Sequence, residues 1–131
     1  MWIYKGEEYN EPGDNYGFVY IITNLTNDRK YIGKKFFWTT KRKTVNKKKK
    51  KVKVESDWKK YWSSSAELIK DIEELGENKF KREIIHLCKS KGVTNYLEAK
   101  EQFLRTVLED NEKWYNGIIN VRVNKTHIRL L

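Results

Sequence analysis

The sequence contains few of the residues that define several protein classes. It has one cysteine, one proline and two histidines in 131 residues. A single cysteine cannot form an intramolecular disulfide, and two widely spaced histidines offer no zinc cluster. Such a composition is typical of an intracellular protein, so we expect a cytoplasmic location. Residues 1–10 lack the apolar stretch of a signal peptide, and no run reaches the roughly 20 apolar residues that cross a bilayer.

The residues that are present predict one folded domain. Apolar residues make up 38% of the chain and aromatic residues 14%, which is too much for a disordered segment. A chain of 131 residues is long enough for one hydrophobic core but not for two. We therefore expect a single domain over residues 1–131.

The positive charge is concentrated in one segment. The net charge is +10, and residues 41–53 hold nine of the 28 basic residues and no acid. Such a block repels itself, so we expect an exposed loop or flexible arm, inserted into the domain. The segment could serve as a solubilising loop, as a nuclear localisation signal or as a binding surface for a polyanion. We favour the binding of phosphate groups. The candidate DNA-binding residues are Lys41, Lys43, Lys47, Lys48, Lys49, Lys50, Lys51 and Lys53. Charge alone does not separate DNA from RNA.

Hydrophobic periodicity and turn residues predict alternating strands and helices. The expected strands cover residues 17–26, 29–34 and 80–88, with a short final strand within 115–124. The expected helices cover residues 55–62, 63–76 and 94–110. This order predicts a small domain in which helices cover a sheet.

The first two strands bring two tyrosines close together. A two-residue turn at residues 27–28 places Asn24 opposite Tyr31 and Ile22 opposite Gly33, whereas a longer loop would change this register. Because side chains alternate along a strand, one face carries Tyr20, Ile22, Asn24, Tyr31 and Gly33. Gly33 leaves a gap through which a ligand can approach. The alternative is a pair of ordinary structural tyrosines.

These segments resemble a known signature. Residues 18–20 read FVY, ten residues follow, and residues 31–33 read YIG. The pattern resembles that of GIY-YIG nucleases, with Phe18 in place of the first glycine. Residues 64–116 are similar to phage homing-endonuclease catalytic domains. The resemblance implies an α+β fold with a small central three-stranded antiparallel sheet flanked by helices, and metal-dependent hydrolysis of phosphodiester bonds.

One acidic residue is a candidate metal ligand. On a helix over residues 95–110, Glu101 falls in the apolar stripe of Leu97, Leu104 and Leu108, whereas Glu98 falls on a polar face. An inward carboxylate is costly unless it is paired or bound to a metal, and the alternative here is a salt bridge with a lysine. By resemblance, the metal-binding glutamate of the family precedes an asparagine by fifteen residues, as Glu101 precedes Asn116. We expect Glu101 to hold one Mg²⁺ or Mn²⁺ ion.

The resemblance implies further catalytic roles. Tyr20 and Tyr31 would orient the attacking water and the phosphate, or one would act as a base assisted by a nearby cation. Lys34 matches a lysine beside the tyrosine, and Asn116 would hold the phosphate or the last strand. The family arginine lies eight residues after the YIG glycine, where this chain has Lys41; we prefer the next residue, Arg42.

Some remaining aromatic and metal-ligating side chains are more simply structural. Trp58, Tyr61 and Trp62 could stack on bases, but core packing is the simpler interpretation. His86 and Cys88 are two residues apart on a strand, and we interpret them as core or edge residues.

The predicted function is a stand-alone, metal-dependent endonuclease for duplex or branched DNA. The resemblance favours a phage or mobile-element nuclease of homing type, working in a bacterial or phage-infected cell. The chain has no room for a separate specificity domain, so we expect targeting by a protein partner or by self-association. The alternatives are a non-catalytic nucleic-acid-binding protein on the same scaffold and a basic RNA-binding protein.

Overall fold

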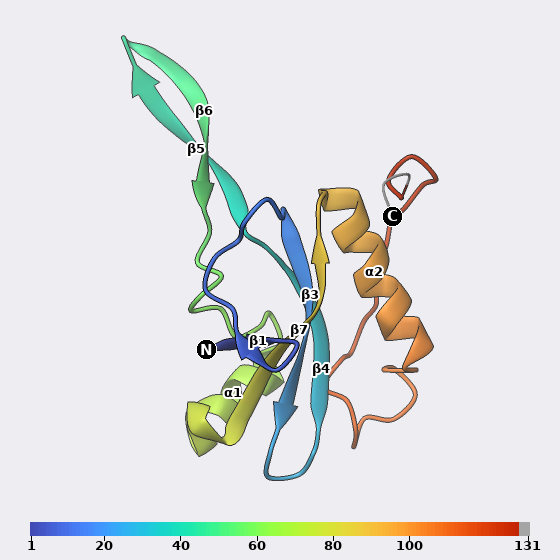
Figure 1. The fold of residues 1–131 in the computed structure, drawn as a ribbon. Helices are drawn as coiled ribbons and strands as arrows, with labels where there is room; N and C mark the ends of the chain where they lie inside the picture. The colour runs from blue at the N-terminus through green and yellow to red at the C-terminus, as the bar shows by residue number, and fades with distance from the viewer. Residues whose placement is uncertain (129–131) are drawn as a thin grey trace.

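The computed structural model describes residues 1–128 of the chain (Figure 1). Its strands are β1 (Trp2–Tyr4), β2 (Glu7–Glu8), β3 (Gly17–Asn24), β4 (Lys30–Phe36), β5 (Trp38–Val45), β6 (Lys48–Glu55) and β7 (Phe80–Cys88). Its helices are α1 (Ala66–Leu75), the short 3₁₀ helix η1 (Glu77–Lys79) and α2 (Lys91–Leu104). Among the described residues, no helix is long and apolar enough to cross a membrane.

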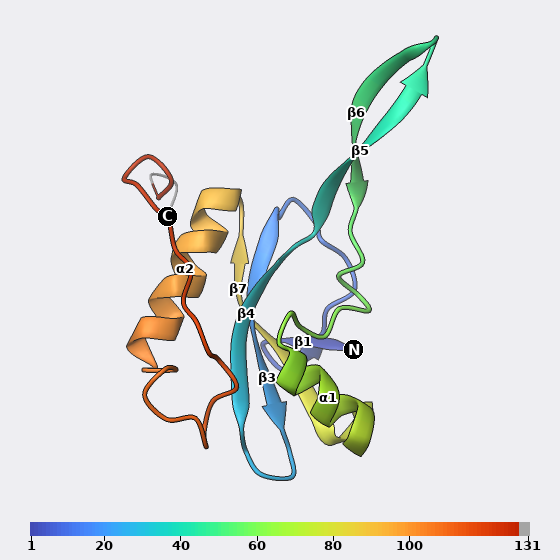
Figure 2. The same ribbon diagram turned by 180° about the vertical axis from the view of Figure 1, so that it is seen from behind.

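Five strands form the main sheet in the order β2-β1-β7-β3-β4. The central strand β3 is antiparallel to both β4 and β7, whereas β1 runs parallel to β7. The expected three-stranded antiparallel sheet is thus present, but β1 and β2 extend it into a mixed sheet. Helices α1 and α2 cover opposite faces of the sheet (Figures 1 and 2).

The face covered by α1 carries an aromatic core. Trp2, Phe18, Phe37 and Trp58 are almost fully buried, and their rings meet at centroid distances of 4.8 to 6.1 Å. The Trp2 indole N–H also donates to the Trp58 carbonyl at 2.7 Å. Phe18 therefore stands in place of the family glycine because its ring fills this core.

The hairpin β3–β4 has a different register from the predicted one. Ile22 lies opposite Tyr31, and Tyr20 lies opposite Gly33. The prediction was wrong by two residues because residues 25–29 form a longer loop. A shift of two residues leaves every side chain on its original face. Tyr20, Tyr31 and Gly33 consequently share one face, as predicted.

Helix α1 agrees with its prediction, since Ser65 caps its first turn and Gly76 follows its last residue. The helix expected over residues 55–62 is wrong, because this segment forms turns around the buried Trp58. The tail over residues 115–124 contains no strand.

Helix α2 begins at Lys91 and ends at Leu104, six residues before the predicted end. Thr106 then has a φ of 53°, a left-handed backbone conformation that does not continue a helix. The predicted inward stripe is wrong in this part, since Leu104 and Leu108 are exposed.

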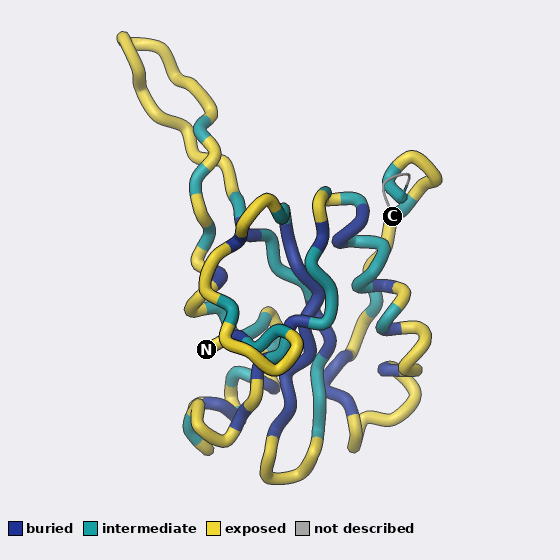
Figure 3. Tube along the Cα trace, viewed as in Figure 1, coloured by how far each residue is buried: buried dark blue, intermediate teal, exposed yellow. Residues whose placement is uncertain are grey.

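The Lys-rich segment is not a flexible arm but a separate two-stranded antiparallel sheet of β5 and β6, with Asn46 and Lys47 in the turn. Both turn residues have positive φ, as a tight hairpin turn requires. The two strands project away from the main sheet (Figure 1), and residues 39–51 are all exposed (Figure 3).

Burial predicts that alanine substitutions of two leucines differ in their effect on the free energy of unfolding. Leu68 of α1 is fully buried, so Leu68→Ala should lower the free energy of unfolding by about 2–5 kcal/mol. Leu104→Ala removes an exposed side chain and should change it by no more than about 0.5 kcal/mol. Urea unfolding of both variants tests this contrast, and a large loss in Leu104→Ala would contradict the described end of α2.

Candidate active site

Two tyrosines of the β3–β4 hairpin form the centre of the site. The rings of Tyr20 and Tyr31 lie 6.2 Å apart on the same face of the sheet. Gly33 makes this arrangement possible, because a Cβ there would lie 2.8 Å from Tyr31 Cε1 and closer still to the Tyr20 hydroxyl. No side chain larger than hydrogen fits at this position.

Tyr61 adds a third phenol. It follows the turns around Trp58, and its ring meets Tyr20 edge-on at 6.2 Å. Burial raises the pKa of Tyr20 well above its ordinary value, and the neighbouring Tyr61 and Tyr31 raise it further. Sequence analysis assigned Tyr61 to core packing. Its place beside Tyr20 depends on a long-range contact that no local pattern signals.

Glu98 of α2 is the acidic residue whose charge acts on these phenols. Its side chain is only 13% exposed, and its charge raises the pKa of both Tyr20 and Tyr31. Burial raises the pKa of Glu98 itself, although the Lys34 ammonium, 3.8 Å away, and the Lys34 backbone N–H both oppose this shift. The site therefore combines clustered hydroxyls with a largely buried carboxylate whose charge acts on two of them.

Hydrogen bonds to the outer edge of β4 fix the position of Glu98 and of the other residues that line this edge. Asn116 Oδ1 accepts from the Ile32 N–H at 3.0 Å, and Asn116 Nδ2 donates to the Ile32 carbonyl at 2.8 Å. Gln102 Nε2 donates to the same carbonyl at 3.1 Å. Two residues along, the Lys34 N–H donates to Glu98. The side-chain amide of Asn116 is thus engaged with the backbone of β4, and it fixes the edge of this strand.

Glu101 does not face the phenols. Its carboxylate accepts from Arg105 Nε at 2.8 Å and bonds to His86 Nε2 at 2.8 Å. Burial acts to raise its pKa, but these two partners outweigh burial and lower it. These contacts include an ion pair with Arg105, which corresponds to the structural salt bridge that sequence analysis gave as the alternative, although with an arginine instead of a lysine. The exposure of Leu104 shows why the apolar stripe misled the prediction.

Two lysines supply the positive charge of the site. Lys34 points to the α2 face, as strand alternation requires, and meets both Glu98 and Asn95 there. Lys35 points to the other face, where its ammonium lies 4.1 Å from the centre of the Tyr61 ring and 2.7 Å from Asp57. Sequence analysis identified Lys34 but missed Lys35.

The predicted equivalents of the family arginine lie elsewhere. Lys41 and Arg42 are exposed residues of β5, in the projecting hairpin. The structure therefore does not bring Arg42 together with Tyr20 and Tyr31. The lysine ammonium on the phenol face is that of Lys35, 4.1 Å from the centre of the Tyr61 ring.

The donor set suits a hard divalent cation better than zinc. Within residues 1–128 no group of three or more His, Cys, Asp or Glu side chains could form an all-protein metal cage. Mg²⁺ commonly uses one or two carboxylates and completes its shell with water and substrate phosphate oxygens. Glu98, a largely buried carboxylate whose charge acts on Tyr20 and Tyr31, fits that requirement.

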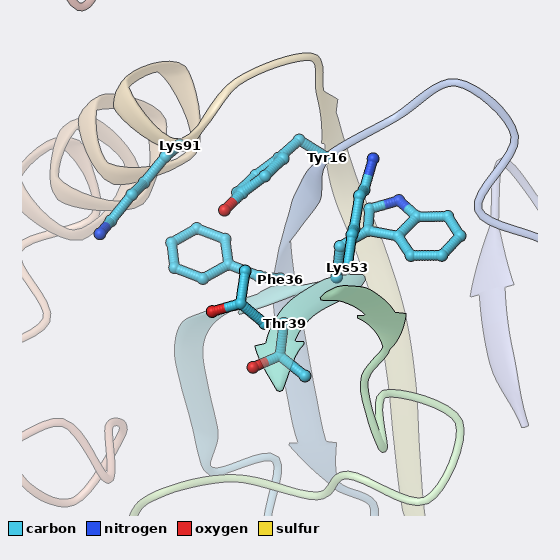
Figure 4. Close-up of a pocket in the computed structure, with 7 residues that line it drawn as sticks. Tyr16, Phe36, Thr39, Lys53 and Lys91 are labelled. Carbon is cyan, nitrogen blue, oxygen red and sulfur yellow. The ribbon is translucent and has the colours of Figure 1, made fainter. Parts of the chain in front are cut away.

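A cavity of about 270 Å³ opens at the root of the projecting hairpin. Tyr16, Phe36, Thr39 and Lys53 line it, together with Lys91 from the start of α2 (Figure 4). A second cavity shares Phe36, Trp38 and Thr39 with the first and reaches Lys34 and Lys35. A continuous surface of aromatic and basic side chains thus leads from the hairpin to the site.

The fold is an α+β domain, and its site combines hydroxyls, a carboxylate and ammonium groups, which act on phosphate esters in many enzymes. Residues 2–119 match the family described as "Putative endonuclease segE, GIY-YIG domain". The chain belongs to the GIY-YIG family, and the resemblance of the FVY and YIG segments is confirmed. No curated protein and no solved structure gave a significant match. The family indicates an endonuclease with a nucleic-acid substrate.

The two glutamates of α2 should respond to neutralisation with opposite signs. The raised pKa of Glu98 means that its ionised form destabilises the fold, a cost absent below about pH 4 and fully present at pH 7. Glu98→Gln should therefore raise the unfolding temperature at pH 7, and this gain should vanish on acidification. The lowered pKa of Glu101 means that its ionised form stabilises the fold at neutral pH, so Glu101→Gln should lower the unfolding temperature. Thermal unfolding across pH 3–7 measures both; effects of equal sign would contradict the assignment.

Proposed function

We propose that this protein is a metal-dependent DNA endonuclease whose single cation binds at Glu98. The observation that carries the proposal is the carboxylate of Glu98, which is only 13% exposed, lies at the edge of β4 against Lys34, and raises the pKa of both Tyr20 and Tyr31. An ionised carboxylate in a largely buried position is costly, and a bound cation would offset that cost. Glu98 thereby takes the role that sequence analysis gave to Glu101.

The phenols position the phosphate rather than remove protons on their own. The pKa of Tyr20 and that of Tyr31 are both raised, mainly by burial, so both hydroxyls stay protonated at neutral pH. Protonated phenols donate hydrogen bonds to phosphate oxygens or to the attacking water. Ser64 Oγ lies 3.3 Å from the Tyr31 hydroxyl and helps to fix its direction. Mg²⁺ or Mn²⁺ at Glu98 would supply Lewis acidity and favour ionisation of a neighbouring hydroxyl.

Lys35 takes the place of the family arginine in this proposal. It lies on the phenol face of β4, where an ammonium can neutralise charge that develops on the phosphate. Lys34 contacts Glu98 and holds the carboxylate while no cation is bound. Asn116 and Gln102 act indirectly, by fixing the edge of β4.

The exposed lysines of residues 41–53 supply affinity for the phosphate backbone. Duplex or branched DNA is the proposed substrate, with targeting by a protein partner or by self-association. The homing-type role in a phage remains a prediction. The second candidate, a non-catalytic nucleic-acid-binding protein, is favoured by one observation: Lys41 and Arg42, the expected equivalents of the family arginine, lie in the projecting hairpin, and a lysine lacks the planar guanidinium fork.

Neutralising Glu98 should abolish cleavage. Glu98→Gln keeps the size of the side chain but loses the anionic ligand, so nicking of supercoiled plasmid in Mg²⁺ should fall by about 100-fold or more. The matched control is Glu101→Gln on the same helix, which should cut at close to the parent rate. Parent protein that binds plasmid but cuts it in neither Mg²⁺ nor Mn²⁺ would favour the non-catalytic alternative. Equal cutting by both variants would refute Glu98 as the metal ligand.

Substitutions of two basic residues should distinguish an effect on the cleavage step from an effect on DNA binding. Lys35→Gln should slow single-turnover cleavage at saturating DNA by about 10–100-fold, since it removes charge beside the reacting phosphate. Arg42→Gln removes one exposed cation from the hairpin and should weaken binding while leaving the saturated rate unchanged. A large loss of saturated rate in Arg42→Gln would instead support the original arginine assignment.

A further inference from the structure

The β5–β6 hairpin, here called the basic ribbon, has no partner in the described part of the chain. Its two strands pair only with each other, and it projects beyond the main sheet (Figure 1). Eight residues per strand at about 3.3 Å each give a length of about 26 Å. An isolated two-stranded sheet is marginally stable in water, so a ribbon of this length suits a surface that becomes ordered against a ligand.

The strand register distributes the charge over both faces of the ribbon. One face, the arginine face, carries Arg42, Lys49, Lys51 and Lys53. The opposite face, the valine face, carries Lys41, Lys43, Lys48 and Lys50 beside three valines. Each face therefore presents four cations, and residues 39–54 contain no acid.

Cross-strand neighbours make this distribution unfavourable in the free protein. Arg42 lies directly opposite Lys51, and Lys43 lies directly opposite Lys50. Like charges in such positions destabilise a strand pair. A ligand with negative charge on two sides would relieve the repulsion on both faces at once, whereas a flat anionic surface would relieve it on one face.

The major groove of duplex DNA has this shape. It is about 12 Å wide and 8.5 Å deep, it admits a two-stranded β-ribbon, and a phosphate backbone runs along each wall. A ribbon inserted edge-on turns each of its two faces toward one wall of the groove, where the long basic side chains reach the phosphates. A ribbon that lay across a single backbone would leave four of its cations unused.

The root of the ribbon fixes its direction relative to the phenols. Only Phe37 separates β4 from β5, and its side chain is fully buried. Ser56, just after β6, ties the second strand to the same place, because its N–H donates to the Phe37 carbonyl at 2.7 Å and its hydroxyl to the Phe36 carbonyl at 2.6 Å. Lys53 covers the Trp38 ring at 4.6 Å. A duplex held by the ribbon is thereby oriented against the strand that carries Tyr31.

We propose that the basic ribbon inserts into the major groove of duplex DNA and uses the cations of both faces to hold the two phosphate backbones. This inference rests on the proposed nuclease function for its substrate class and adds the mode of recognition. It commits the ribbon to duplex DNA, because the major groove of double-stranded RNA is too deep and narrow for side chains to read.

The test compares two matched sets of substitutions in the full-length protein. One variant replaces the four cations of the arginine face with glutamine, and the other replaces the four of the valine face. Binding to a labelled DNA duplex is measured in EDTA over a range of salt concentrations. Groove insertion predicts that both variants bind more weakly and that each lowers the salt slope by about 0.9 for every phosphate that the variant no longer neutralises. Unfolding temperatures close to the parent value confirm that both variants are folded, as the exposure of all eight substituted residues predicts.

Two further measurements test whether the protein binds in the major groove. Bound protein should protect guanine N7, a major-groove atom, from methylation, and a minor-groove ligand should not displace the protein. The proposal is overturned if one set of substitutions leaves the salt slope unchanged, if guanine N7 stays fully reactive, or if duplex RNA binds as tightly as duplex DNA.

The two proposals fail in different ways. A parent protein that protects guanine N7 but never cuts refutes the nuclease function and leaves the ribbon inference standing. A protein that cuts in Mg²⁺ but loses no affinity in one of the two variants refutes groove insertion and leaves the nuclease function standing.

Discussion

The edge of β4 is the constraint on which the site depends. An edge strand exposes backbone donors and acceptors that must be paired or covered. Here Gln102 and Asn116 pair the Ile32 peptide groups, and Glu98 accepts from the next outward N–H. The hydrogen bonds that complete the sheet thus also hold a carboxylate beside Tyr31. One row of contacts therefore both completes the sheet and fixes Glu98, and it includes Asn116, which is remote in sequence.

Sequence patterns predicted the tyrosine face of the hairpin well and the extent of α2 badly. The register was wrong by two residues, yet the tyrosine face was correct, because only the parity of a strand position decides its face. On a helix, an error in the predicted extent is not compensated in this way. The apolar pattern of α2 continues past Leu104, but the helix does not, so the stripe that pointed to Glu101 included leucines that are exposed. Glu98 was placed on a polar face because the pattern cannot show that β4 lies against it.

The remaining differences come from contacts between distant segments. Tyr61 lies in turns organised by the burial of Trp58, and its approach to Tyr20 follows from the aromatic core rather than from any neighbouring residue. The strands of the basic ribbon were not predicted because a run of lysines shows no hydrophobic alternation. The family could be inferred from a few residues, namely the two tyrosines and Gly33. These residues pack closely against one another, so their types are fixed and the motif is visible in the sequence.

The single residue between β4 and β5 has a mechanical consequence. With Phe37 buried and Ser56 bound to its carbonyl, the junction contains no hinge. If the basic ribbon holds duplex DNA as proposed, any mismatch in curvature between the protein and a straight double helix must be absorbed by the nucleic acid. Steps that kink easily, such as TA and CA, would meet the tyrosines at the lowest elastic cost. A rigid joint can therefore discriminate among sequences whose bases it never touches.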